Sequence, residues 1–539
     1  MPIAAYARIL TAFAAIAVAY PAGFAVAQTT ETAIRITPFQ QTIAETAAAD
    51  RDLAAFYRAS DFAPIWTGQG EPFLSRRQAL FNILGKADDH GLPGVSYNVS
   101  GLKAEMRNAR TASDLAKLDV RLSQFFIEFG TDLQTGVLTP ARIDSGIVRK
   151  VPIRDRVSYL TGITSNDPMG FVESLAPQRP EYTRLMREKL RLESLISVGG
   201  FGPVVRTDSL KPGQSGNDVI SLRNRLMAMG YLPRRVDATY DTEMEGAVLQ
   251  FQIDHGLPED GIAGAATIAE INTPAEDRLK SVIVAMERER WINRDLGERH
   301  VLVNLTDFHA RIIDNDKVYF KTRSVIGKNI STHRTPEFSD VMEHMIINPT
   351  WNVPRSIAVR EYLPAFKRNA HSNGHLKLIN ARGQVVDRSS VNFAAYNERN
   401  FPFDIKQPPS SRNALGLVKF MFPNVHNIYL HDTPAKSLFA RDMRAFSHGC
   451  IRLREPFEFA YALLGWQTDD PEGYFKSRLN TGRETRVDLA APLPVHLIYR
   501  TAMSQPKGHM TYRRDVYERD AKIWNALARE GVELRGVQG

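Results

Sequence analysis

The spacing of apolar residues changes a little past the middle of the chain, and this change divides it into regions of different architecture. Two earlier segments, 44–58 and 113–131, carry apolar residues at the spacing of a helix. Two later segments, 301–305 and 317–320, are typical of strands, with a turn-forming sequence at 314–316. The chain has 539 residues, whereas a single core rarely exceeds about 300 residues. We therefore predict a multidomain α+β protein.

Glycine-rich and proline-rich turns, such as 199–203, indicate where domains end. In the segment that follows, apolar residues share one face of a helix that ends before Gly230, a residue typical of a C-terminal cap. We predict a mostly helical N-terminal scaffold at 28–205, a small three-helix module at 206–274, a linker helix at 275–300, a β-rich domain at 301–505 with a cap or lid inserted at about 352–411, and a C-terminal extension at 506–539.

The first residues have the pattern of a secretory signal peptide. An apolar run at 9–19 precedes the small-x-small sequence Ala25-Val26-Ala27, so we predict removal of residues 1–27. An uncleaved anchor is the alternative, because 9–27 approaches the roughly 20 residues that span a bilayer. Both interpretations export the protein to the cell envelope, which is the periplasm where two membranes are present. No later stretch has the length and apolarity of a transmembrane segment.

The charge of the chain is mildly basic. It has 68 basic and 60 acidic residues, a net charge of +8, and the basic residues are scattered among acids. Because no run of Lys and Arg resembles a nucleic-acid-binding arm, we expect no nucleic-acid partner. The excess of positive charge suits contact with an anionic cell envelope.

The chemistry of the chain is concentrated around Cys450, its only cysteine. A single thiol cannot form an internal disulfide, which leaves an apolar filler, an intermolecular link or a nucleophile. Cys450 ends the sequence Ser447-His448-Gly449-Cys450, and this polar setting favours the nucleophile. An activated thiol is expected to react faster near pH 6 than the thiol of the unfolded chain.

His431 is the predicted base for this nucleophile. Alternation along 427–431 places Tyr429 and His431 on one face of a strand, and Cys450 and Arg452 share a face in the same way. Two neighbouring strands would bring these four groups into one cleft. His431 would either remove the thiol proton or stabilise the thiolate as an ion pair. A backbone carbonyl could orient its second ring nitrogen.

The remaining residues of the motif have roles that follow from their type. The backbone N–H groups of Gly449 and Cys450 are candidate oxyanion donors, and Arg452 can hold a substrate carboxylate. His448 is the alternative base, but we expect it to shape the loop. One cysteine and two histidines do not supply the four ligands of a structural zinc site. We therefore expect no zinc site from these residues.

These residues carry a family resemblance. His431, fifteen further residues and then Ser447-His448-Gly449-Cys450-x-Arg452 resemble the catalytic signature of the L,D-transpeptidases, the YkuD domain. Segments 334–338, 348–354 and 494–502 are similar to the large multidomain branch of that family. Residues 210–274 resemble the peptidoglycan-binding-1 module, with Ala263 where the module often has a bulkier residue.

The resemblance implies an enzyme that acts on peptidoglycan stem peptides and binds its glycan. Cys450 would attack the third residue of a tetrapeptide stem, release D-Ala and form a thioester, which the amine of another stem converts into a 3→3 cross-link. Ser447, His448, Tyr429 and Arg452 would line the substrate site, and carbapenem-type inhibitors would acylate Cys450. Family resemblance also implies no metal and no cofactor.

Other functions stay open from the sequence. Water in place of the acceptor amine would make the protein an L,D-carboxypeptidase, and a protein amine would make it a wall-protein attachment enzyme. A scaffold that only binds peptidoglycan through residues 210–274 is a further alternative. The sequence also leaves open whether that module binds the wall or only packs against the catalytic domain.

Overall fold

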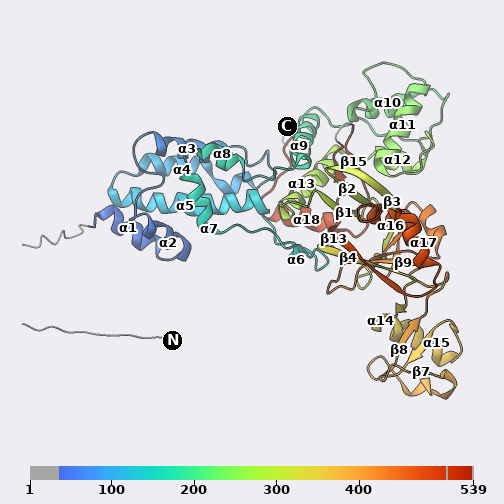
Figure 1. The fold of residues 1–539 in the computed structure, drawn as a ribbon. Helices are drawn as coiled ribbons and strands as arrows, with labels where there is room; N and C mark the ends of the chain where they lie inside the picture. Colours follow the sequence, from blue (N-terminus) through green and yellow to red (C-terminus); the bar gives the residue numbers. More distant parts are fainter. Residues whose placement is uncertain (1–35, 506–507, 537–539) are drawn as a thin grey trace, which may run out of the picture.

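The structure is a computed structural model that describes residues 36–505 and 508–536 (Figure 1). The predicted signal peptide, 1–27, lies outside the described residues. Within the described part of the chain, no helix combines the length and apolarity needed to cross a membrane. The predicted multidomain α+β architecture is confirmed: a helical N-terminal region, a small helical module and a β-rich region that contains an insertion.

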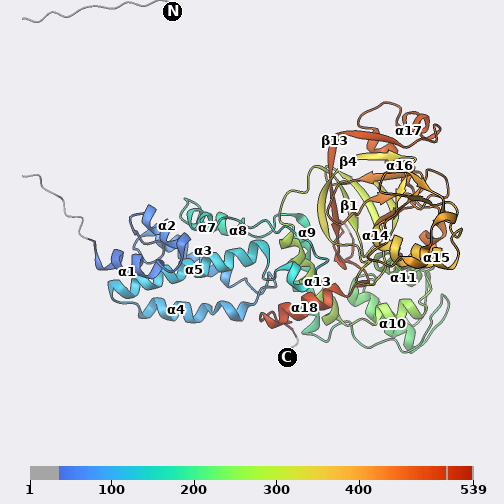
Figure 2. The ribbon, with the colours of Figure 1, turned by 90° about the horizontal axis from the view of Figure 1, so that it is seen from below.

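Helices build the N-terminal region, which extends away from the β-rich part of the molecule (Figure 2). The segment 44–58, whose apolar spacing is helical, is divided between two helices, because Asp50 accepts hydrogen bonds from the amides of Asp52 and Leu53 and so starts a second helix. The bounds are α1 (Pro38–Ala47), α2 (Arg51–Ala59), α3 (Glu71–Leu84), η1 (Gly94–Tyr97), α4 (Val99–Asn108), α5 (Ala112–Thr135), α6 (Pro140–Ile143), α7 (Arg156–Ile163), α8 (Pro168–Glu173) and α9 (Pro180–Ile196).

The small module contains the three predicted helices, α10 (Asn217–Met229), α11 (Thr242–His255) and α12 (Ala265–Ile271). Gly230 caps α10 with a left-handed φ of 92°. Ala263 is fully buried and forms an antiparallel bridge with Leu210, so this position belongs to the core of the module. One side of the module is covered by the C-terminal segment, where the ring of His509 stacks on Tyr231 at 4.0 Å.

Helix α13 (Ala275–Trp291), predicted as part of a linker, is buried at the junction of the regions. Its Arg288 forms ion pairs with Glu337 at 2.7 Å and with Asp520 at 3.1 Å. Arg519 also binds Glu337, at 3.1 Å. Asp520 and Arg519 belong to α18 (Arg519–Arg529), so the C-terminal extension is locked onto α13 by buried charges and is part of the same body.

The β-rich domain is a nine-stranded sheet in the order β11-β3-β12-β10-β9-β4-β13-β1-β2, and a further β2–β3 pairing closes it on itself. The strands are β1 (Arg299–Asn304), β2 (His309–Asp314), β3 (Lys317–Gly327), β4 (Phe338–Ile347), β9 (Val418–Met421), β10 (Leu430–His431), β11 (Ala445–Ser447), β12 (Ile451–Leu453) and β13 (Thr485–Ile498). Helical segments and a hairpin accompany it: η5 (Lys436–Ala440), α16 (Pro456–Leu464), α17 (Pro471–Leu479), β14 (Ala502–Met503) and β15 (Thr511–Tyr512).

The strand predicted over 427–431 is wrong in its first part, since only Leu430 and His431 form β10. Asn427 has a left-handed φ of 53°. The side chain of Asn424 bonds both the carbonyl of Ile428, at 2.8 Å, and its amide, at 3.2 Å. These local bonds replace the ladder and end the strand early.

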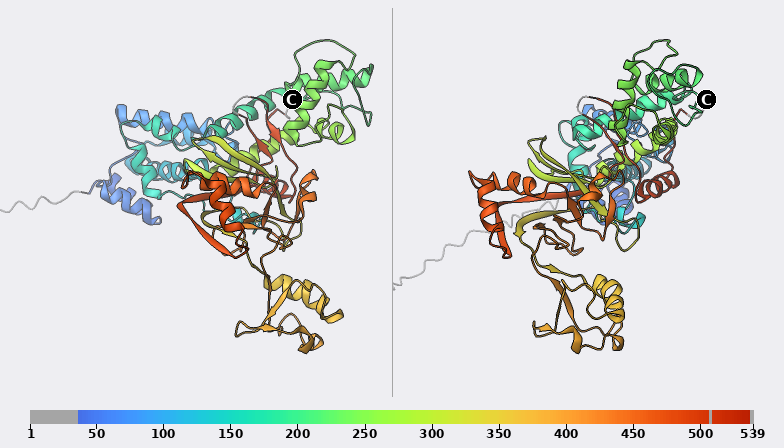
Figure 3. Two further views of the ribbon diagram at one scale, coloured as in Figure 1. Left: turned by 45° about the vertical axis from the view of Figure 1, so that its right-hand side comes forward. Right: turned by 90° about the vertical axis from the view of Figure 1, so that its right-hand side faces the viewer.

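The insertion forms a lobe of its own beside the β-rich domain (Figure 3). Its sheet has the order β5-β8-β6-β7, and its apolar residues form a separate core. The elements are β5 (Trp351–Asn352), α14 (Arg355–Ile357), the π-helical segment η2 (Ala358–Tyr362), α15 (Leu363–Arg368), β6 (Lys377–Ile379), β7 (Val385–Val386), η3 (Arg388–Ser390), η4 (Phe393–Ala395) and β8 (Asp404–Gln407).

Candidate active site

Two short parallel strands bring the predicted site residues together. β10 pairs with β12 so that His431 lies opposite Arg452. The amide of Ile451 donates to the carbonyl of Tyr429 at 3.0 Å, so Cys450, the residue before Ile451, lies beside Tyr429. The fold therefore gathers the thiol, imidazole, phenol and guanidinium that the sequence pattern indicated.

The thiol of Cys450 is in its neutral form at physiological pH. The side chain is half-buried, and Sγ lies 3.5 Å from the carbonyl oxygen of Asn427. Burial raises the pKa of the Cys450 thiol to about 11, although hydrogen bonds from Tyr429 and the charge of Arg452 act in the opposite direction. Desolvation thus outweighs the nearby positive charges, which disfavours the fast reaction near pH 6 that the sequence led us to expect.

His431 is also neutral, which leaves one ring nitrogen able to accept a proton. It is buried, and its Nδ1 lies 2.5 Å from the carbonyl oxygen of Asp432, the carbonyl contact expected from the sequence. Burial lowers the pKa of His431 to about 3, with a further contribution from Arg452. Residues 36–505 and 508–536 show no hydrogen bond between His431 and Cys450. A neutral pair favours proton transfer during attack over a resting ion pair.

Asp432 positions His431 through the backbone. Its carboxylate accepts hydrogen bonds from the amides of Leu417 at 2.9 Å and Thr433 at 2.7 Å, and pairs with Lys436 at 2.7 Å. These bonds hold the turn whose carbonyl bonds the imidazole. Sequence reasoning found no acidic orienter, because Asp432 acts through its main chain and not through a direct carboxylate contact.

Two cations flank the imidazole on the sheet. His431 lies opposite Arg452 on β12 and opposite Lys419 on β9, so the three side chains form a row across three strands. Burial lowers the pKa of Lys419 and of Arg452. The Nε of Arg452 is buried and has no hydrogen-bond partner among the described residues. Sequence reasoning missed Lys419, which the alternation of 418–421 places on the same face.

The loop before Cys450 is held in a strained shape. Gly449 has a φ of 124°, and a Cβ there would lie 3.1 Å from Ile428. The amide of Gly449 donates to Ser447 Oγ at 3.1 Å, Ser447 Oγ donates to the Cys450 carbonyl at 2.5 Å, and Thr335 Oγ1 donates to the Gly449 carbonyl at 2.7 Å. In the described structure the amide of Cys450 has no acceptor, so of the two predicted oxyanion donors it is the one that is free.

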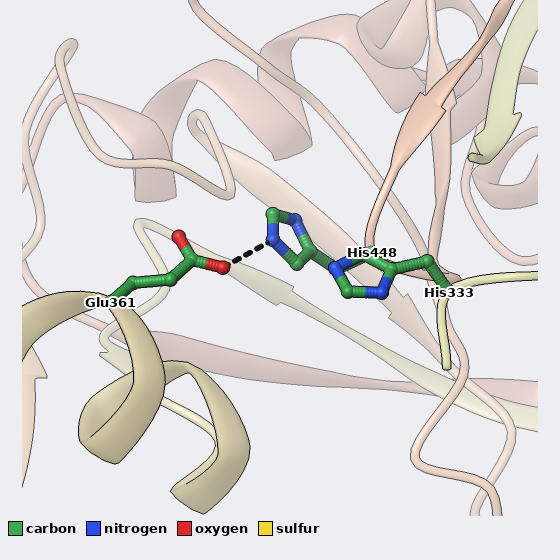
Figure 4. A group of neighbouring side chains, drawn as sticks. All are labelled: His333, Glu361 and His448. Atoms are coloured by element: carbon green, nitrogen blue, oxygen red, sulfur yellow. Dashed lines mark hydrogen bonds and ion pairs between the residues drawn. The ribbon is translucent and has the colours of Figure 1, made fainter. Parts of the chain in front are cut away.

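Tyr429 and His448 lie on opposite sides of this loop. The ring of Tyr429 is 5.6 Å from that of His431, and its proximity to the Cys450 thiol lowers the pKa of that thiol against the larger effect of burial. His448 turns outward, and its Nε2 lies 2.7 Å from Oε1 of Glu361 in η2 (Figure 4). The insertion therefore reaches the catalytic motif through one side chain, a contact that the sequence did not indicate.

Comparison with protein families identifies this domain. Residues 298–472 match the model of the L,D-transpeptidase catalytic domain, YkuD, which includes His431 and Cys450. The chain contains an L,D-transpeptidase catalytic domain. Two further matches accompany this L,D-transpeptidase domain: the model described as a scaffold domain at 51–188 and the one described as "Putative peptidoglycan binding domain" at 215–271.

Relatives of known sequence agree with these matches over part of the chain. A protein of Haemophilus influenzae named "Putative L,D-transpeptidase" is 29% identical over 229 residues, 41% of this chain and 45% of the relative. The spore cortex-lytic enzyme of Bacillus cereus is 41% identical over 58 residues, 11% of this chain and 22% of that protein. The chain thus spans less than half of the length of these relatives.

One solved structure, the L,D-transpeptidase of Xylanimonas cellulosilytica (its residues 123–326), is 14% identical and covers 55% of this chain and 100% of that one. Its TM-score of 0.17 is too low to support a structural argument.

Proposed function

We propose that the protein is a peptidoglycan L,D-transpeptidase that forms 3→3 cross-links between stem peptides through a thioester on Cys450. The observation that carries the proposal is the pairing of β10 with β12, which brings His431 and Arg452 together next to Cys450 within the residues that match the L,D-transpeptidase model. The peptidoglycan-binding match at 215–271 and the catalytic domain together support action in the cell envelope. We infer that the exported protein works in the periplasm.

Acylation begins when Sγ of Cys450 attacks the carbonyl of the third stem residue. The Sγ proton passes to the neutral imidazole of His431 as the S–C bond forms. The amide of Cys450 donates to the oxyanion, and one such donor contributes about 3–4 kcal/mol to the transition state. Collapse of the intermediate breaks the C–N bond, and the imidazolium gives its proton to the departing amine of D-Ala.

Deacylation reverses these roles. The side-chain amine of an acceptor stem attacks the thioester, His431 removes a proton from that amine, and the C–S bond breaks. The thiolate then receives the proton from the imidazolium, which restores the neutral pair. Arg452 and Lys419 suit the carboxylates of the donor stem, because a partly buried guanidinium with an unpaired Nε can gain a charge-assisted hydrogen bond.

The direct test is mass spectrometry of residues 28–539 incubated with disaccharide-tetrapeptide, beside the Cys450→Ala variant. The expected product is a dimer with the mass of two muropeptides less one alanine, absent with the variant. A tripeptide without a dimer would show an L,D-carboxypeptidase instead. If no product forms and Cys450 also resists a carbapenem, the catalytic proposal fails and a wall-binding scaffold remains.

A further inference from the structure

Three side chains from separate parts of the chain converge beside the catalytic loop (Figure 4). His333 comes from the connection between β3 and β4, Glu361 from η2 of the insertion, and His448 from the residue before Gly449. One donor atom from each lies within 4.8 Å of the other two. The rings of His333 and His448 are 4.3 Å apart.

We propose that His333, Glu361 and His448 bind a Zn²⁺ ion that fastens the insertion to the catalytic loop. Two imidazoles and one carboxylate are the three-ligand set of open zinc sites, in which water completes the tetrahedron. Mg²⁺ and Ca²⁺ favour sites made of oxygen ligands, so this donor set selects against them. The sequence argument against zinc considered Cys450 with two histidines, whereas the fold assembles a different set.

The donor atoms need only small shifts. Ligand atoms about 2.1 Å from zinc in a tetrahedron are about 3.4 Å apart, so donor atoms that now lie up to 4.8 Å apart must approach by about 1.4 Å. The Nε2 of His448 and Oε1 of Glu361, now 2.7 Å apart, must separate by about 0.7 Å and exchange their hydrogen bond for bonds to the ion. Their side chains are 32% and 49% exposed, which leaves them free to adjust and leaves the site open to an ion from solvent.

His333 is already oriented for such a role. Its Nδ1 lies 2.7 Å from Oγ1 of Thr332, the kind of outer partner that fixes the tautomer of a metal-binding histidine. No hydrogen bond to its Nε2 is found in the part of the chain that the structure describes, so this nitrogen is available. Glu361 lies in a π-helical segment, and such segments occur frequently at functional sites.

The consequence is a bridge between two bodies. Glu361 belongs to the lobe with its own core, while His333 and His448 belong to the β-rich domain. A bound ion would hold the lobe against the loop that carries Cys450. Because Glu361 is the ligand that comes from the insertion, its loss removes the bridge, together with the hydrogen bond that it makes to His448 in the ion-free protein.

Zinc binding to residues 28–539 tests the proposal, by competition with a chromophoric chelator at pH 7.5. The background is Cys450→Ala, since a thiolate would itself bind zinc. We expect one ion per chain, with affinity at least about tenfold weaker in each of Glu361→Gln, His333→Gln and His448→Gln. Glu398→Gln, an exposed carboxylate of the same insertion, is the matched control and should bind as the parent does.

The bridge has its own readout in amide hydrogen exchange. Zn²⁺ should slow exchange over 355–368 in the parent and leave it unchanged in Glu361→Gln, whereas Mg²⁺ should have no effect. The proposal is overturned if no ion binds, if Glu361→Gln binds zinc as tightly as the parent, or if binding leaves exchange in the insertion unchanged.

Discussion

At the scale of single residues, desolvation sets the chemistry of the site. Burial moves the pKa of Cys450 up to about 11 and that of His431 down to about 3, so each group is held in its neutral form. Arg452 and Lys419 lie close enough to favour a thiolate, but they do not overcome burial at Cys450. In the proposed mechanism, the thiol of Cys450 is therefore activated only when the substrate arrives and the proton moves to His431.

Thiol alkylation tests this resting state. The raised pKa keeps Cys450 protonated below about pH 11, whereas an unfolded-chain thiol with a pKa of 9.0 loses its proton two pH units earlier. At pH 7 the native thiolate is thus about a hundredfold less populated, and iodoacetamide should react correspondingly slowly. The rate should rise about tenfold for each pH unit up to about 11.

The control for alkylation is the same protein unfolded in urea. Its only thiol has the same reagent access at all pH values and should react faster than the native thiol at pH 7. A native thiol that reacted faster than the unfolded one at pH 6–7 would show a resting ion pair with His431 and contradict the neutral pair.

Asp432→Asn tests the positioning of His431. The amide can still accept one backbone hydrogen bond but loses the charge that pairs with Lys436 at 2.7 Å, so the turn and its carbonyl should shift. Acylation of Cys450 by a carbapenem, followed by mass spectrometry at a temperature where the variant is fully folded, should slow by up to about a hundredfold. Asp442→Asn, at an exposed neighbouring acid, should acylate normally; equal rates in both variants would dismiss the positioning role.

At the scale of elements, the loop between β11 and β12 decides whether the site works. Ser447 and Thr335 donate hydroxyl bonds to carbonyls of this loop, Gly449 has a positive φ, and the amide of Cys450 has no acceptor among the described residues. The motif spacing indicated a close backbone approach at Gly449. It did not indicate Thr335, which reaches the loop from the segment between β3 and β4.

Gly449→Ala tests this element. A Cβ at a φ of 124° costs about 1–3 kcal/mol and would lie 3.1 Å from Ile428, so the loop should change shape. We expect acylation at least about a hundredfold slower, as for the loss of an oxyanion donor. Gly264→Ala, where φ is −74° and nothing lies within 4 Å of the added carbon, should behave as wild type. Full activity in Gly449→Ala would contradict the assigned role of this loop.

At the scale of the whole molecule, buried charges join the regions. Glu337 of the β-rich domain contacts Arg288 of α13 and Arg519 of α18, and all three side chains are at most 5% exposed. Glu337→Gln would leave two buried guanidinium groups without their shared counter-ion. We expect the free energy of unfolding to fall by about 3–5 kcal/mol, measured by urea unfolding.

A matched surface substitution controls for charge loss alone. Glu472→Gln removes an exposed carboxylate that pairs with Lys476, and such pairs contribute at most about 1 kcal/mol. If Glu337→Gln were no more destabilising than Glu472→Gln, the buried network would not be what holds the C-terminal helix in place.

The sequence alone determined much of this architecture because its signals are local. Helical spacing and capping residues predicted α10 to α12, and alternation predicted the strands on which Arg452 and His431 lie. The assignment of Cys450 as nucleophile from its motif stays a prediction. Local hydrogen bonds can also make a prediction from alternation wrong. The strand predicted to begin at 427 begins only at Leu430, because the side chain of Asn424 bonds the backbone of Ile428.

Only the tertiary structure decided what depends on burial and on distant partners. The pKa values of Cys450 and His431 are set by how deeply the closed sheet buries them, and no local pattern reports that depth. Lys419 reaches the site through strand pairing, and Glu361 through an insertion that folds on its own core. The residue types thus determine which chemical groups the site contains. Packing determines the protonation state of these groups and which other side chains lie beside them.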